Sequence, residues 1–165
     1  RAVVDLAPTF ITIHAGGGRE MMKAAVEEAG SQAVKQNVAR PKLLGVTVLT
    51  SLDRSDLEST GVNADPSDQV LRLAALAQES GLDGVICSPL EIEALRRQCG
   101  SDFVLMVPGI RPVGSAANDQ KRAMTPRQAV DLGATNLVVG RPIYQAQDPR
   151  AAAEAIAREA GVNDL

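Results

Sequence analysis

The feature that most constrains this chain is a helix start that recurs between short apolar segments. A Ser, Thr or Asp is followed directly by Pro at four places, Asp65-Pro66, Ser88-Pro89, Thr125-Pro126 and Asp148-Pro149. The first side chain can accept a hydrogen bond from the N-terminus of a helix, and proline at the first helical position gives up an N–H that lacks a partner there. Each of these dipeptides therefore predicts the beginning of a helix.

Short runs rich in Val, Leu and Ile separate the predicted helices, and such runs are typical of parallel strands that are buried on both faces. The predicted strands cover 10–15, 43–49, 84–87, 103–110 and 136–140. The predicted helices cover 19–37, 65–81, 88–100, 125–133 and 148–160, and residues 2–6 fit the end of a further helix. Alternating strands and helices indicate βαβ units on a parallel sheet, so the predicted fold class is α/β.

Two architectures fit this alternation: an open doubly wound sheet and the larger part of an eight-stranded barrel. A barrel normally takes about 250 residues, and this chain has 165. The chain opens on a helix without a preceding strand, and its last strand is followed by residues suited to phosphate. We therefore expect a (β/α)8 TIM barrel of which about five strands and their helices are present. Residues 1–165 would form a single domain, the C-terminal part of the barrel, with three βα units upstream of Arg1.

Composition limits the classes of partner. The net charge is −3 and only three residues are aromatic, so neither a nucleic acid nor an anionic membrane is an expected partner. No stretch approaches the roughly 20 apolar residues of a membrane helix. Cys87 and Cys99 are too few for a disulfide framework or a zinc site, and indicate reduced thiols in a cytoplasmic protein.

In both architectures ligands bind at the carboxyl ends of the strands. The polar residues predicted at these ends are His14, Thr50, Ser51, Ser88, Arg111 and Arg141. Because this set holds no carboxylate and no lysine, it predicts the binding of an anionic ligand without a centre for acid-base chemistry. We interpret His14 as a structural residue, Ser88 as a helix cap and the three glycines at 16–18 as a turn.

Arg111 and Arg141 each follow a strand and a glycine, in the segments Pro-Gly-Ile-Arg and Val-Gly-Arg-Pro. An arginine offers a planar fork that binds an oxyanion through two hydrogen bonds, and Gly140 would let a backbone N–H approach the same oxyanion. Barrel phosphate sites commonly follow the seventh and eighth strands. The pattern therefore predicts a phosphate site, the alternative being two surface arginines paired with helix carboxylates.

Two further polar residues are candidates for ligand binding. Thr50 follows an apolar strand, and its hydroxyl can donate and accept a hydrogen bond to a ligand or cap its own turn. Gln120 lies in the long loop at 111–124, a length that favours a functional loop. Its amide would add a hydrogen bond to the phosphate if the loop closes over the site, or else remain solvated.

Six segments resemble the orotidine 5'-phosphate decarboxylase family, most closely its bacterial branch. They are Ile-His-Ala-Gly-Gly at 13–17, Val-Thr-Val-Leu-Thr-Ser at 46–51, Gly-Leu-Asp-Gly-Val-Ile-Cys-Ser at 81–88, Pro-Gly-Ile-Arg at 108–111, Asn-Asp-Gln at 118–120 and Val-Val-Gly-Arg-Pro at 138–142. The two arginine segments around an Asp-Gln loop are specific as a set, and the likeness runs over the whole chain.

The resemblance implies a (β/α)8 barrel that removes CO2 from orotidine 5'-phosphate to give UMP, in de novo pyrimidine biosynthesis, without a metal or organic cofactor. It also implies a cytoplasmic homodimer that binds this small-molecule nucleotide. Carried over by motif, the phosphate-binding residues are Arg111, Gln120, Gly140 and Arg141. Thr50 would form a hydrogen bond with the pyrimidine edge.

The family's reactive centre is an Asp-x-Lys-x-x-Asp motif, whose lysine protonates the carbon that loses CO2. Residues 1–165 do not contain this motif, which by the family's layout lies upstream of Arg1. No catalytic residue is therefore assigned here, and residues 1–165 alone should be inactive. Two other functions remain open: a phosphosugar aldolase or epimerase on the same barrel, and a phosphate-ligand binding domain without catalysis.

Overall fold

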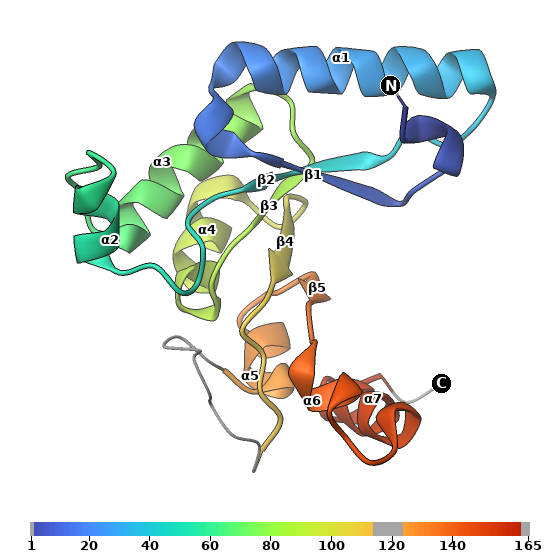
Figure 1. Cartoon of the computed structure of the whole chain (residues 1–165), viewed down its shortest axis with the longest axis vertical. Coiled ribbons are helices and arrows are strands. Elements are labelled where there is room, and N and C mark those ends of the chain that lie inside the picture. The colour runs from blue at the N-terminus through green and yellow to red at the C-terminus, as the bar shows by residue number, and fades with distance from the viewer. Residues whose placement is uncertain (1, 114–123, 163–165) are drawn as a thin grey trace.

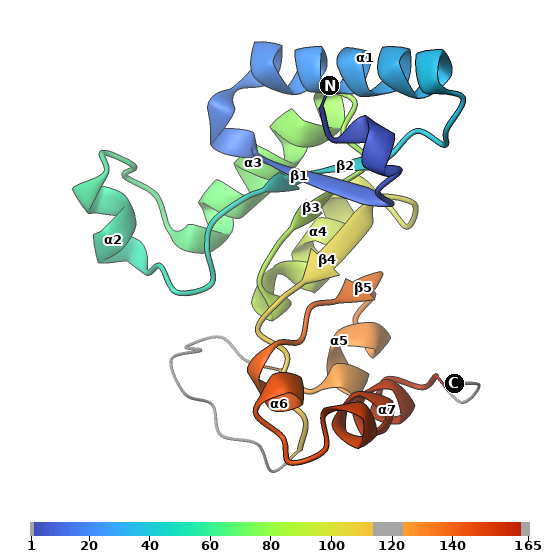
Figure 2. The same cartoon turned by 45° about the vertical axis from the view of Figure 1, so that its right-hand side comes forward.

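The computed structural model describes residues 2–113 and 124–162. Within these residues five strands form one parallel sheet, namely β1 (Phe10–His14), β2 (Lys42–Val46), β3 (Gly84–Ile86), β4 (Val104–Val107) and β5 (Asn136–Leu137). They lie side by side in chain order (Figure 1 and Figure 2). The predicted α/β class and its parallel sheet are confirmed.

This strand order separates the two architectures that the sequence left open. A doubly wound sheet reverses its order at a switch point, whereas every strand of a barrel wall lies beside its neighbours in sequence. The order from β1 to β5 contains no reversal. The five strands are therefore part of the wall of a (β/α)8 barrel.

Seven α-helices are present in the described residues: α1 (Arg19–Gln36), α2 (Arg54–Ser59), α3 (Pro66–Glu79), α4 (Ile92–Cys99), α5 (Pro126–Asp131), α6 (Arg141–Tyr144) and α7 (Pro149–Glu159). Three 3-10 turns accompany them, η1 (Val4–Leu6), η2 (Ala15–Gly17) and η3 (Pro89–Glu91). In Figure 1, α1 lies along the β1 end of the sheet and α5 to α7 gather at the β5 end. Within the described ranges, no helix combines the length and apolar character needed to cross a membrane.

The predicted helix starts are confirmed, two of them as reciprocal caps. The Ser88 hydroxyl accepts a hydrogen bond from the N–H of Leu90 (3.3 Å), and the Glu91 carboxylate accepts one from the N–H of Ser88 (2.8 Å). Thr125 and Gln128 form the same pair of bonds at the start of α5. Ser88 is thus a helix cap, as the sequence predicted.

Two short helices, α2 and α6, were missed by the sequence analysis. α2 lies in the polar stretch after β2, where Asp53 and Asp56 cap each other's backbone but only Leu57 is buried. One buried residue gives no apolar periodicity to detect. α6 has only four residues, and the predicted helix end at residues 2–6 proves to be the single 3-10 turn η1.

All five strands end earlier at the carboxyl end than predicted, and β2, β4 and β5 do so by three residues each. β4 stops at Val107 because the next residue, Pro108, has no N–H to donate to a neighbouring strand. Past the end of β5 the N–H of Val138 still donates to the carbonyl of Val107 (2.9 Å). The chain then leaves the sheet. The apolar residues continue past the last paired residue, and the strands predicted from them are therefore too long.

The two faces of the sheet differ in burial. Leu43, Val85 and Leu105 lie on the face that packs against the helices, and all three are buried. Val46, Ile86 and Met106 lie on the other face as register partners across three strands, and each is half-buried. These three side chains, near the carboxyl ends of their strands, are therefore partly accessible from the inner side of the barrel wall, whereas Leu44 and Val104 on the same face are buried.

The Arg96 guanidinium ties the start of β4 to the start of β5. It donates to the carbonyl of Phe103 (2.6 Å), to the carbonyl of Gly133 (2.8 Å) and to the hydroxyl of Thr135 (2.8 Å). The same hydroxyl accepts a hydrogen bond from the N–H of Leu105 (3.0 Å). These bonds satisfy carbonyls at helix and strand ends that otherwise lack partners, and so hold the two strands in register.

Candidate functional site

A cavity of about 310 Å³ lies where β2, β3 and β4 end. It is lined by Val46, Val48, Leu49, Thr50, Ser51, Ile86, Cys87 and Pro108. All of these residues lie at the carboxyl ends of the three strands or directly after them. This is the edge of a parallel sheet at which α/β proteins bind their ligands.

Thr50 is part of the wall of this cavity, as one of its few polar residues. It lies in the segment between β2 and α2, whose two ends are held by hydrogen bonds. At one end the Thr47 hydroxyl donates to the carbonyl of Ile86 (2.7 Å), and at the other Asp53 begins α2 with its capping box. The position fits the predicted role of Thr50 in ligand binding, and that role stays a prediction.

Ser51, which the sequence analysis also placed at a strand end, lies in the same wall. The rest of the wall is largely apolar, and the sequence analysis did not single it out. Burial, and to a smaller extent the nearby Glu91 carboxylate, raise the pKa of the Cys87 thiol to about 12. Cys87 is therefore a neutral thiol that packs like a small apolar side chain at physiological pH. The sequence analysis placed Cys87 at the end of the predicted strand 84–87 and Pro108 within the predicted strand 103–110, so neither residue was a candidate for the site.

Arg111 follows β4 and is almost completely buried, with 9% of its surface exposed. Its Nη1 donates to the carbonyl of Ile110 (2.7 Å), and its backbone N–H donates to the carbonyl of Met124 (2.9 Å). Ile110 and Met124 also form a parallel bridge. The guanidinium is thus held within the protein at the carboxyl edge and is not one of the surface arginines of the alternative interpretation.

Arg141 is the first residue of α6 and follows β5 through Gly140. It is half-buried. The backbone of Gly140 has a φ of −111°, and a Cβ there would meet only ordinary contact, 3.6 Å from a ring carbon of Tyr144. The space around Gly140 within the described residues would therefore admit a side chain.

Arg111 and Arg141 occupy matching places on neighbouring strands. Val107 of β4 and Leu137 of β5 are register partners. Arg111 follows Val107 by four positions, and Arg141 follows Leu137 by the same number. The structure thus brings the two arginines to the same edge of the sheet, although neither lines the 310 Å³ cavity. Gln120, the third predicted phosphate ligand, lies outside the described residues.

His14 ends β1 at the same edge and is exposed. It is the register partner of Val46, a cavity residue. Within the described residues the structure gives its imidazole no hydrogen bond that would support the predicted structural role.

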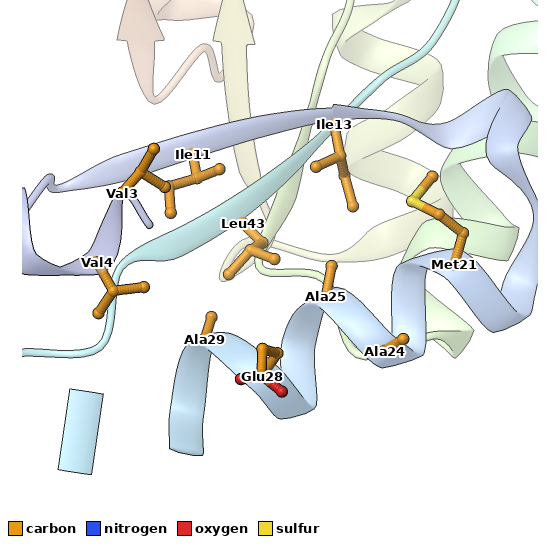
Figure 3. Close-up of a pocket in the computed structure, with 10 residues that line it drawn as sticks. All are labelled: Val3, Val4, Ile11, Ile13, Met21, Ala24, Ala25, Glu28, Ala29 and Leu43. Carbon is orange, nitrogen blue, oxygen red and sulfur yellow. The ribbon is translucent and has the colours of Figure 1, made fainter. Parts of the chain in front are cut away.

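Further hollows lie away from the carboxyl edge, and two of them have mainly apolar linings. One, of about 400 Å³, is formed by η1, β1 and α1 (Figure 3). Its lining is apolar except for Glu28, and Ile11, Ile13 and Leu43 point from the sheet toward Ala25 and Ala29 of α1. The other, of about 430 Å³, lies between α5, β5 and α7 and is also mainly apolar. Both lie away from the carboxyl edge at which α/β proteins bind their ligands, so neither is the candidate site.

Comparison with known proteins gives a consistent picture. The family model described as "Orotidine 5'-phosphate decarboxylase / HUMPS family" matches residues 2–156. The orotidine 5'-phosphate decarboxylase of Rhodospirillum rubrum is 54% identical over 159 residues, which are 96% of this chain and 64% of that protein. The enzyme of the same name from Paramagnetospirillum magneticum is 51% identical, over 98% of this chain and 69% of its own length.

A solved structure agrees with these sequence matches. The crystal structure of orotidine 5'-phosphate decarboxylase from Lactobacillus acidophilus superposes with a TM-score of 0.82 at 41% identity, covering 96% of this chain and 66% of that one. The chain thus spans about two thirds of the length of the relatives that it matches. The family model and both relatives cover nearly all of the chain, which therefore belongs to the orotidine 5'-phosphate decarboxylase / HUMPS family.

Proposed function

We propose that this protein decarboxylates orotidine 5'-phosphate to UMP in de novo pyrimidine biosynthesis, and that residues 1–165 supply its phosphate and pyrimidine contacts. The observation that carries the proposal is the identity of 54% and 51% to two proteins named orotidine 5'-phosphate decarboxylase, over nearly the whole chain. The cavity at the carboxyl edge of β2 to β4, with Thr50 in its wall, supports it.

The phosphate is proposed to bind at the ends of β4 and β5. Arg111 and Arg141 lie at matching positions after these paired strands, so two guanidinium groups are available to one dianion. An arginine–phosphate pair forms short, charge-assisted hydrogen bonds that are often bidentate. Since the space around Gly140 admits a side chain, the close approach of a ligand phosphate explains the glycine there. Gln120 is proposed to add a further hydrogen bond.

The pyrimidine is proposed to enter the 310 Å³ cavity. The Thr50 hydroxyl can donate to a ring carbonyl or accept from a ring N–H. Ile86, Cys87 and Pro108 would surround the ring with apolar surface, which excludes water from the carbon that loses CO2.

No catalytic residue is assigned within residues 1–165, because the family's Asp-x-Lys-x-x-Asp motif is absent from them. Binding energy from a remote phosphate can support chemistry elsewhere on the same substrate, since it helps to hold the reacting end in an unfavourable environment. We propose this division of labour, with proton transfer carried out by the family motif without a metal or organic cofactor. We also propose that the whole enzyme is a cytoplasmic homodimer.

The proposal is tested by assaying the full-length protein and residues 1–165 in parallel. Conversion of orotidine 5'-phosphate is followed by the change in ultraviolet absorbance, with product UMP identified by chromatography. We expect turnover by the full-length protein after exhaustive dialysis against a chelator, and no turnover by residues 1–165. Absence of turnover by a folded full-length protein that binds UMP would overturn the assignment and favour a binding role.

A further inference from the structure

Thr47 makes an unusual double contact at the end of β2. Its hydroxyl donates to the carbonyl of Ile86 at 2.7 Å, and its backbone N–H donates to the same carbonyl at 3.4 Å. The residue is 8% exposed. The backbone bond continues the β2–β3 ladder one residue past the last register pair, Val46 and Ile86. The shorter side-chain bond is therefore the stronger attachment of the β2 segment to β3 beyond the sheet.

This attachment lies between two parts of the cavity wall. Ile86 and Cys87 contribute the wall on the β3 side. Val48, Leu49, Thr50 and Ser51 contribute the wall on the β2 side. Thr47 precedes all four residues of the second group and bonds directly to the first, so its hydroxyl sets the distance between the two sides.

We propose that Thr47 is a positioning residue, which acts on a bound nucleotide through Thr50. The inference rests on the proposed function, because it assigns Thr50 to the pyrimidine. The far end of the segment is anchored by the Asp53 capping box and by Leu57, which is buried. At the near end the Thr47 hydroxyl forms the shorter of the two bonds to the Ile86 carbonyl. When that bond is lost, the longer backbone bond and the far anchor remain, and the place of Thr50 relative to β3 is less closely fixed.

Valine is the matched substitution, because it keeps the β-branched shape of threonine and replaces the hydroxyl with a methyl group. The Ile86 carbonyl would still accept the backbone N–H of residue 47. Thr47→Ser is the conservative counterpart, because it keeps the hydroxyl and removes the methyl group.

The test uses the full-length protein and four variants, T47V, T47S, T50A and the double variant T47V/T50A. Dissociation constants are measured for UMP and for ribose 5-phosphate, which carries the phosphate but no pyrimidine. A hydrogen bond of average net strength corresponds to about a fivefold change in affinity. We expect T47V to lower the affinity for UMP by about this factor and to leave the affinity for ribose 5-phosphate unchanged. T47S should retain its affinity for both ligands.

The double variant separates positioning from an independent effect. If Thr47 acts through Thr50, T47V/T50A binds UMP no more weakly than T50A alone, since the effects of two residues that act through one contact are not additive. The proposal would be overturned if the loss of UMP affinity in the double variant equalled the product of the losses in the two single variants. A T47S variant as weak as T47V, or a T47V variant with equal losses for UMP and ribose 5-phosphate, would also overturn it.

The outcomes also separate this inference from the proposed function. If T50A leaves UMP affinity unchanged, the pyrimidine assignment is wrong. If T50A lowers the affinity for UMP and T47V does not, only the positioning role of Thr47 is wrong. Should T47V fail to fold, as judged by its thermal melt, Thr47→Cys replaces it, because a thiol is a weak donor of similar size and carries the same expectation.

Discussion

Val107 and Leu137 are register partners on β4 and β5, and an arginine follows each of them by four positions. Two cationic side chains are thereby delivered to one edge of the sheet by strands that are hydrogen-bonded to each other. Their relative position is set by the strand pairing as well as by the loops that carry them. This arrangement leads to the first of four predictions, all for the full-length protein.

Replacement of Arg141 by alanine should lower kcat/KM for orotidine 5'-phosphate by a factor that corresponds to about 2 to 5 kcal/mol of activation free energy. This is the usual loss when one partner of a desolvated charge pair is removed. The reaction of orotidine, which lacks the phosphate, should change little. Steady-state kinetics on both substrates give the comparison. Arg150→Ala is the control, because that side chain is 90% exposed and, among the residues that the structure describes, pairs only with Glu154 of its own helix. Equal losses on the two substrates would count against a phosphate contact.

Arg96 should contribute far more to stability than its neighbour Arg97. Arg96→Ala removes donors from the carbonyls of Phe103 and Gly133, and each hydrogen bond of this kind is worth about 1 to 3 kcal/mol. We expect the free energy of unfolding in urea to fall by about 2 to 4 kcal/mol. Arg97 is 72% exposed and lies 3.8 Å from Glu93, so Arg97→Ala should change stability by less than about 0.5 kcal/mol. Similar values for the two variants would contradict the role assigned to Arg96.

Ser88→Ala should lower the free energy of unfolding by about 0.5 to 2 kcal/mol, the range measured for N-cap residues. The Ser88 side chain is fully buried and accepts a hydrogen bond from the N–H of Leu90. Alanine would leave this N–H without its acceptor. Ser101→Ala is the control, since Ser101 is exposed and bonds only to its neighbour Asp102 through its hydroxyl in the described residues. Urea denaturation of both variants provides the measurement, and a loss no larger than that of the control would argue against the cap.

The Cys87 thiol should be inert in the folded protein and should make stability fall at high pH. Burial raises its pKa from 9.0 to about 12, so the folded state keeps a proton that the unfolded state has lost in this interval. The stability contribution is therefore fully present below pH 9 and is lost as the pH rises toward 12, with a slope of at most about 1.4 kcal/mol per pH unit. Urea denaturation at pH 8.5 to 10.5 should show a steeper decline for the parent than for Cys87→Ala.

Alkylation by iodoacetamide at pH 8 checks the same thiol independently. The peptide that contains Cys87 should remain unmodified in the native protein and react after unfolding, as measured by mass spectrometry. Rapid native labelling would show that the thiol is accessible, which contradicts its burial.

The sequence predicted the parts of this structure that depend on local chemistry. Ser88 and Thr125 revealed helix starts because capping involves residues only a few positions apart. The runs at 84–87 and 103–110 revealed strands because burial on both faces demands a continuous apolar segment. The chain order of the strands, by contrast, had to come from the structure, and it decided between the barrel and the doubly wound sheet.

The wall of the cavity was only partly predictable. Thr50 stood out because it is polar and follows a strand, but Cys87 and Pro108 are ordinary residues until the strand ends are brought together. The contact between Thr47 and Ile86 joins residues 39 positions apart, and no local pattern reports it. Helices α2 and α6 were missed because each is too short to show a periodic apolar face.

Every strand pairing joins neighbours along the chain, with the register running from β1 to β5 without a jump. A polypeptide of this kind can be assembled as it is synthesised, because each new βα unit docks on the one that has just emerged. Few contacts have to wait for a distant segment, which shortens the time during which apolar strand surface is exposed to other nascent chains.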